Sequence, residues 1–135
     1  MSNITIVDND YMLIEYLSDK KIISHVVRKP VSGKPFRDAL NAGTDALIQY
    51  GACKWMSDDR LNGPLPQADV DWGNNEWNAR TVAGGWKFWA LVVPQEVAAA
   101  GSLIPVVESL YERGLRVMVF TKTKDALDWL DKQQC

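Results

Sequence analysis

Histidine and cysteine are scarce in this chain, which has one histidine, His25, and two cysteines, Cys53 and Cys135. A lone histidine excludes a zinc site or a catalytic pair built on two histidines, and two cysteines cannot make a disulfide framework. We expect no bridge between them, because Cys53 lies in a predicted strand as a small apolar residue and chain termini are poorly ordered. Free thiols favour a reducing compartment.

Long apolar runs and an excess of basic charge are also missing. No segment approaches the roughly 20 apolar residues of a membrane helix, and residues 1–10 are too polar for a secretory signal. The 15 Lys and Arg residues stand against 17 Asp and Glu, a formal net charge of −2. Nucleic-acid binders usually carry a basic surplus. We therefore expect a cytoplasmic protein that does not bind nucleic acid.

The chain that remains has the composition of one globular domain, which we place over residues 1–135. Its 135 residues are 47% hydrophobic and 24% charged, as is usual for such domains. Segments 4–7, 11–17 and 21–28 are rich in β-branched and aromatic residues, and their short polar connectors predict an antiparallel meander. From Pro35 apolar residues recur at steps of three and four, which predicts a helix ending at Gly51.

Strands and helices are expected to alternate after that helix. The expected elements are a strand at 52–56, a helix at 67–82, a strand at 86–93, a short helical piece at 96–101, a helix from 102 to 114 with Pro105 in its first turn, a buried strand at 115–120, and a helix at 124–132 capped by Thr123. The order is βββαβαβαβα. It predicts an α/β fold with a mixed sheet covered by helices.

The segment 53–77 concentrates the groups that could form a site. The predicted strand 52–56 stops at Ser57, Asp58, Asp59 and Arg60, and a loop with two prolines leads to a helix carrying Trp72 and Trp77. Open α/β sheets usually bind ligands at the carboxyl ends of their strands. We therefore expect a binding site next to the end of this strand.

Several segments in this order resemble the SpoIIAA-like family, also called STAS/SEC14-domain proteins. They are the three-strand start, the run 52–60 ending in Arg60, the proline-rich loop with its tryptophans, the run 91–94 (LVVP), the strand 117–120 (VMVF) and the run 125–130 (DALDWL). The resemblance implies a STAS-like mixed sheet. Relatives with this fold include anti-anti-sigma regulators phosphorylated on a serine at a strand–helix junction, and Sec14-type lipid carriers. The regulators have adjacent serines there, whereas here Ser57 is followed by Asp58.

The polar cluster has a functional and a structural interpretation. Ser57 could be a hydrogen-bonding group or a phosphoacceptor, and Arg60 could hold an anion. Alternatively Asp58 or Asp59 closes a turn, and Arg60 pairs with one of them. Adjacent carboxylates without His or Glu partners do not predict a metal site, a cofactor or a catalytic residue.

Six tryptophans are many for this length. Trp86 and Trp89 should lie on opposite faces of a strand, because their separation is odd. Trp72 and Trp77 should diverge by about 140° on a helix. We expect one of each pair in the core and the other partly exposed, where it could meet a partner, a membrane or an apolar ligand.

These patterns predict a non-enzymatic binding or regulatory module that recognises a protein partner or a small apolar or anionic ligand. The residues expected to bind it are Trp55, Ser57, Asp58, Asp59, Arg60, Trp72 and Trp77. The alternative is a Sec14-like carrier of lipid or other apolar ligands that touches membranes. An enzyme using Ser57 or Asp59 is the least favoured alternative, and an exposed sheet edge or tryptophan patch could support a homodimer.

Overall fold

The protein has one six-stranded mixed sheet, seen in a computed structural model that describes residues 3–135. The strands follow one another across the sheet in chain order. They are β1 (Asn3–Asp8), β2 (Met12–Leu17), β3 (Ile22–Val27), β4 (Lys54–Asp58), β5 (Phe88–Val92) and β6 (Arg116–Phe120). The first three pair antiparallel, and β3 to β6 pair parallel. The predicted α/β class, mixed sheet and opening meander are confirmed.

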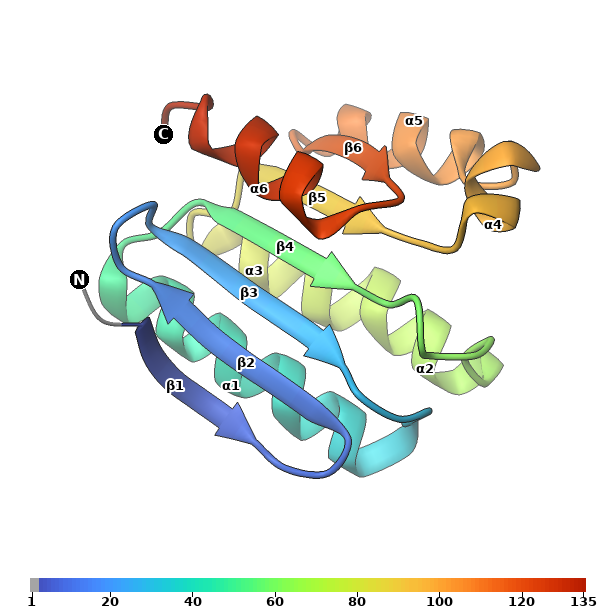
Figure 1. Ribbon diagram of the computed structural model, residues 1–135, viewed down its shortest axis with the longest axis horizontal. Helices are drawn as coiled ribbons and strands as arrows, with labels where there is room; N and C mark the ends of the chain where they lie inside the picture. Colours follow the sequence, from blue (N-terminus) through green and yellow to red (C-terminus); the bar gives the residue numbers. More distant parts are fainter. Residues whose placement is uncertain (1–2) are drawn as a thin grey trace.

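Helices cover both faces of the sheet, but unequally (Figure 1). They are α1 (Gly33–Tyr50), α2 (Gln67–Trp72), α3 (Asn78–Ala83), α4 (Gln95–Ala99), α5 (Ile104–Glu112) and α6 (Thr123–Asp131), with a π-helical turn, η1 (Gly73–Trp77), joining α2 to α3. Because the parallel strands are added in one direction, crossovers of one hand place their helices on one face. Figure 1 shows α6, which follows the last strand, in front of the sheet and α1, α3 and α5 behind it.

The boundaries of β4 differ from the prediction in a way that affects the site. The strand runs over Lys54–Asp58, two residues later than the predicted 52–56. The N–H of Ala52 is still bonded to the carbonyl of Leu47 at the end of α1. Ser57 and Asp58 instead continue the ladders with β3 and β5. Two residues of the polar cluster are therefore strand residues with opposite orientations.

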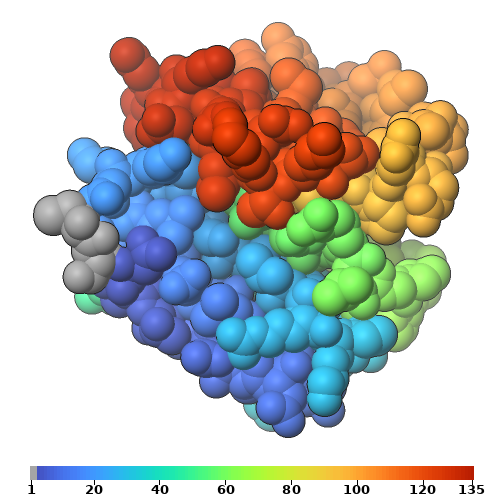
Figure 2. All heavy atoms as spheres, viewed as in Figure 1, coloured from blue at the N-terminus to red at the C-terminus, as the bar shows by residue number. Residues whose placement is uncertain are grey.

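Two hydrophobic clusters hold the layers together. The larger lies between the sheet and the helices of the more covered face, and the smaller lies between the sheet and α6. Figure 2 shows α6, in red, over only the upper part of its face, with the blue amino-terminal strands beside it. The candidate site lies against the larger cluster, where the connecting helices meet the sheet.

Four tryptophans pack against one another in the larger cluster: Trp55, Trp77, Trp86 and Trp89. The ring centroids of Trp77 and Trp86 are 5.0 Å apart, as are those of Trp86 and Trp89. The prediction that Trp86 and Trp89 lie on opposite faces is therefore wrong. Strand β5 begins only at Phe88, and Gly85 with φ of 118° redirects the chain before Trp86, so the strand alternation does not apply. In both pairs one tryptophan is buried, Trp77 or Trp86, and the other, Trp72 or Trp89, is partly exposed, as predicted.

The strand β6 is an edge strand rather than the buried strand expected from its apolar sequence. Arg116 is exposed and Met118 is 44% exposed. The reason is topological, because β6 pairs only with β5. The expectation that Thr123 caps α6 is also wrong, since Lys122 occupies the cap and Thr123 is the first helical residue.

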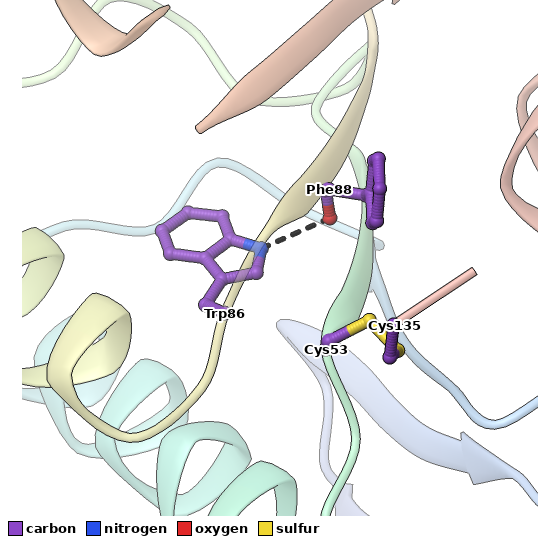
Figure 3. Close-up of a disulfide and its surroundings, with 4 residues drawn as sticks. All are labelled: Cys53, Trp86, Phe88 and Cys135. Carbon is purple, nitrogen blue, oxygen red and sulfur yellow. Dashed lines mark hydrogen bonds between the residues drawn. A yellow bond between two sulfur atoms is a disulfide. The ribbon is translucent and has the colours of Figure 1, made fainter. Parts of the chain in front are cut away.

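The two cysteines form a disulfide, contrary to the sequence expectation. Cys53, just before β4, is bonded to Cys135, and their Cα atoms are 5.9 Å apart (Figure 3), a separation that suits a disulfide. The direction of α6 across the sheet brings the distant residue 135 back to the start of β4. Because both cysteines are in the bridge, no free thiol remains to favour a reducing compartment. The cytoplasmic location stays a prediction.

We expect Cys135→Ser to lower the free energy of unfolding by about 2–4 kcal/mol, because the bridge closes a loop with a sequence separation of 82 residues and restricts the unfolded chain. Urea unfolding of protein purified without reductant measures this, with the exposed neighbour changed in Gln134→Ser as the control. Reaction of both thiols with Ellman's reagent in the unfolded, unreduced protein would show that the bridge does not form.

We expect Gly43→Ala to destabilise the protein by about 1–3 kcal/mol through overpacking. A Cβ at Gly43 in α1 would lie 2.5 Å from Cη2 of Trp55, and the tryptophan cluster leaves that ring no room to move. Gly73→Ala is the matched control, since nothing lies within 4 Å of its Cβ position and alanine favours helices. Equal stability of both variants in thermal unfolding would contradict the tight packing of Trp55.

Candidate functional site

The predicted polar cluster is divided between the two faces of the sheet. Ser57 lies on the side of α1 and α3, and Asp59, just after β4, turns to the same side, where it meets His25. Asp58 and Arg60 lie on the side of α6, where both contact Thr123. The four residues therefore do not form one site.

On the α6 side, Asp58 and Arg60 form a closed ion pair. Nε and Nη2 of Arg60 donate to the two carboxylate oxygens of Asp58, at 2.9 and 2.8 Å. Burial raises the pKa of Asp58, but the hydrogen bonds from Arg60 and Thr123 outweigh it and leave the pKa lowered. The expectation that Arg60 pairs with one of the aspartates is confirmed, and its guanidinium is engaged within the protein.

On the other side, a cavity of about 350 Å³ opens at the carboxyl ends of β3, β4 and β5. Its floor includes His25, Ser57 and Leu91, which are neighbours across the three strands. Helix residues and the loop after β4 form the walls, among them Phe36, Leu40, Leu65, Val70, Trp77 and Val106. Figure 2 shows that loop, in green, beside the segment after β3, in light blue, and Val31 N–H donates to Oδ1 of Asn62 between them.

His25 is buried, and hydrogen bonds occupy both of its ring nitrogens. Nε1–H of Trp55 donates to Nδ1 at 3.1 Å, and an indole nitrogen can only donate. Nδ1 is therefore unprotonated, and the proton on Nε2 is donated to Oδ1 of Asp59 at 2.8 Å. This arrangement holds a neutral imidazole against an ionised carboxylate. None of residues 3–135 donates a hydrogen bond to the other oxygen of Asp59.

Ser57 is fully buried in the cavity floor. Its hydroxyl oxygen accepts a hydrogen bond of 2.8 Å from Nε1 of Trp89, and Trp89 also lines the cavity. His25 is the neighbour of Ser57 on β3, but both ring nitrogens of His25 are engaged, so no lone pair is left to accept the Ser57 proton. A kinase would reach this hydroxyl only after the fold opened locally, so phosphorylation of Ser57 stays a prediction.

The helical wall contributes a polar atom without a partner. Asn78 is 4% exposed, and its Oδ1 is buried with no hydrogen-bond partner. Buried polar atoms of this kind are rare in folded proteins. Asn78 follows η1, and such π-helical turns are frequent at functional sites. Both features lie at the wall of the same cavity.

Asp69 fixes this wall to the beginning of α1. Its carboxylate accepts from the N–H of Gly33 and from Nε of Arg37, each at 2.8 Å, and it is almost completely buried. The Gly33 N–H first, and then Arg37, lower the pKa of Asp69. Arg37 therefore neutralises the charge of Asp69, and its guanidinium also lies over the ring of Trp72.

The tryptophans expected to bind a ligand have different positions. Trp55 is buried in the tryptophan cluster, Trp77 lines the cavity, and Trp72 lies against Phe36 in an adjoining depression. Sequence reasoning missed Trp89 and Asn78, and it treated His25 as a sheet residue. A single polar histidine in an apolar strand was the only signal that could have pointed to the cavity.

Other hollows of similar size contain fewer polar groups. One of about 410 Å³ lies between α3 and α5, and its described lining contains no carboxylate, serine or histidine. Within residues 3–135, no cluster of three or more His, Cys, Asp or Glu residues is placed to hold a metal ion. In the same part of the chain, no helix combines the length and apolarity needed to cross a membrane.

Comparison of the chain with models of known protein families, with curated proteins and with solved structures found no match.

We expect Asp69→Asn to lower the free energy of unfolding at pH 7 by about 1–3 kcal/mol, because a charged acceptor is lost from two hydrogen bonds. The native pKa of Asp69 is lowered from its ordinary value near 3.8. Its contribution to stability is therefore present above that value and is lost as the pH falls below it, toward the lower native pKa. Urea unfolding at pH 7, 4 and 3 should show the wild type converging on the variant. Asp71→Asn, at an exposed aspartate on the same helix, α2, is the control. A stability difference between wild type and Asp69→Asn that stays constant from pH 7 to pH 3 would contradict the stabilising role of the ionised Asp69.

Proposed function

We propose that this protein is a non-enzymatic binding module whose ligand is a small, largely apolar molecule held in the cavity at the ends of β3, β4 and β5. The observation that carries the proposal is the combination of an apolar cavity with buried polar groups at its wall and floor. Its volume of about 350 Å³ lies in the range of small-molecule sites, roughly 300–1,000 Å³. The ring of His25, Oδ1 of Asn78 and the hydroxyl of Ser57 are positioned by the fold around this space.

The hydrogen bonds of His25 support the non-enzymatic part of the proposal. Acyl transfer by Ser57 would need a base able to take its proton. Nδ1 of His25 already accepts from Trp55, and Nε2 already donates to Asp59. Binding is the simpler use of these groups.

We further propose a STAS-like, SpoIIAA-like identity for the domain. The support is the order of elements along the chain, three strands followed by alternating helices and strands, together with the segments that resemble the family. The same proposal includes regulation, in which a protein partner or a second copy of the chain controls the binding of the ligand in the cavity.

The alternative is an apolar-ligand carrier that touches membranes. Its support is the apolar surface of α5, where Ile104, Val106 and Tyr111 are all exposed. Val106 also lines the cavity. An apolar ligand could therefore enter beside a helix that contacts lipid.

We expect Val106→Trp to abolish binding of a neutral probe, 2-phenylethanol, because the larger side chain fills the cavity from its wall. Val106 is 43% exposed, so the fold should tolerate the change. Saturation-transfer NMR of the probe measures binding. Ile104→Trp is the matched control, because it lies on the same helix, is 58% exposed and is not part of this cavity's lining.

Binding that survives Val106→Trp unchanged would place the probe elsewhere and contradict the proposed site. Flotation of the wild-type protein with phosphatidylcholine vesicles, kept or strengthened in both α5 variants because tryptophan favours the membrane interface, would favour the membrane-touching carrier instead.

A further inference from the structure

The charge around the cavity is not balanced. Its described lining contains two carboxylates, Asp59 and Asp69, and no lysine or arginine. Arg37 compensates Asp69 from outside the lining. Among the described residues, the Asp59 carboxylate pairs only with the ring of His25, and that ring is neutral because Trp55 holds its Nδ1 as an acceptor. The cavity therefore carries one negative charge without a cation.

Two acceptor atoms of the cavity lining receive no hydrogen bond from the described residues. Within residues 3–135, no donor reaches Oδ2 of Asp59, whose side chain is 31% exposed. Oδ1 of Asn78 is buried and has no partner. Of the two, the partly exposed Oδ2 of Asp59 is the acceptor that a ligand in the cavity can reach, and it pairs with an N–H or O–H group. A bound anion would bring further acceptors and a second negative charge.

We propose that the ligand of this cavity is a small amine: an apolar body that contacts Trp77, Trp89 and Leu91, with an ammonium group that pairs with Asp59. This inference rests on the proposed function and narrows its ligand class. The hydrogen bond from His25 to Oδ1 orients the carboxylate and leaves Oδ2 for the ammonium. Charge-assisted hydrogen bonds of this kind are stronger than neutral ones.

The apolar part of the cavity suits an aromatic or aliphatic body. Tryptophan faces attract cations as well as apolar groups, and two of the four clustered tryptophans, Trp77 and Trp89, reach the lining. Their indole N–H groups are already bonded, to Thr44 and Ser57. They therefore offer ring surface to a ligand rather than hydrogen-bond donors.

Three probes with one body and different charges test the inference: 2-phenylethylamine, 2-phenylethanol and 3-phenylpropionate. At pH 7 they are a cation, a neutral molecule and an anion. We expect the wild type to bind the amine about fivefold or more tightly than the alcohol, and the carboxylate most weakly. Dissociation constants come from NMR titration of the full, oxidised chain.

The source of the preference is tested with Asp59→Asn, which can still accept from His25 through its amide oxygen. We expect this variant to bind amine and alcohol equally, with the affinity for the alcohol unchanged within about twofold. Asp71→Asn removes the same charge from the exposed surface of α2, outside the cavity, and should keep the preference. Should Asp59→Asn fail to fold, amide shifts of the wild type decide, and the amine must move the signals of residues 59–62 and 78.

Each outcome has a separate meaning. An amine preference that is lost in Asp59→Asn supports the inference. Equal binding of all three probes, tighter binding of the carboxylate, or a preference that survives Asp59→Asn overturns it while leaving the binding module intact. Failure of all three probes to bind the wild type overturns the proposed function itself.

Discussion

The structure depends on the packing of four tryptophans whose indole N–H groups must all find acceptors inside the protein. Trp55 donates to His25, Trp77 to Thr44, Trp86 to the carbonyl of Phe88, and Trp89 to Ser57. Buried N–H groups without partners would cost free energy comparable to the packing that the rings contribute. The cluster therefore determines which polar groups sit beneath the cavity and how they are oriented.

This constraint connects packing to chemistry through His25. In most settings a buried histidine beside an aspartate could carry its proton on either nitrogen. Here the donor from Trp55 leaves Nδ1 as the acceptor, and Asp59 receives the remaining proton. The negative charge of Asp59 stays at the cavity as a result. The fully buried indole of Trp55 therefore keeps His25 neutral, and the negative charge of the partly exposed Asp59 is left without a cation.

The disulfide and the ion pair of Asp58 and Arg60 stabilise the opposite face. Cys135 ties the end of α6 to the start of β4, and Thr123 at the beginning of α6 contacts Asp58 near the end of the same strand. Both ends of α6 are therefore attached to β4. On the other face of the sheet, residues of α2, η1 and α5 form walls of the cavity.

The sequence by itself determined the order of strands and helices and the antiparallel start, and it pointed to a candidate site next to β4, because periodicity and turn residues act locally. It did not determine which side of the strand each polar residue faces, since a two-residue shift in the limits of β4 made Ser57 and Asp58 strand residues. Only the tertiary structure joined Cys53 to Cys135 and brought His25, Trp89 and Asn78 around one cavity. Those contacts join residues far apart in the chain, and the crossovers and packing that create them leave no local pattern to read.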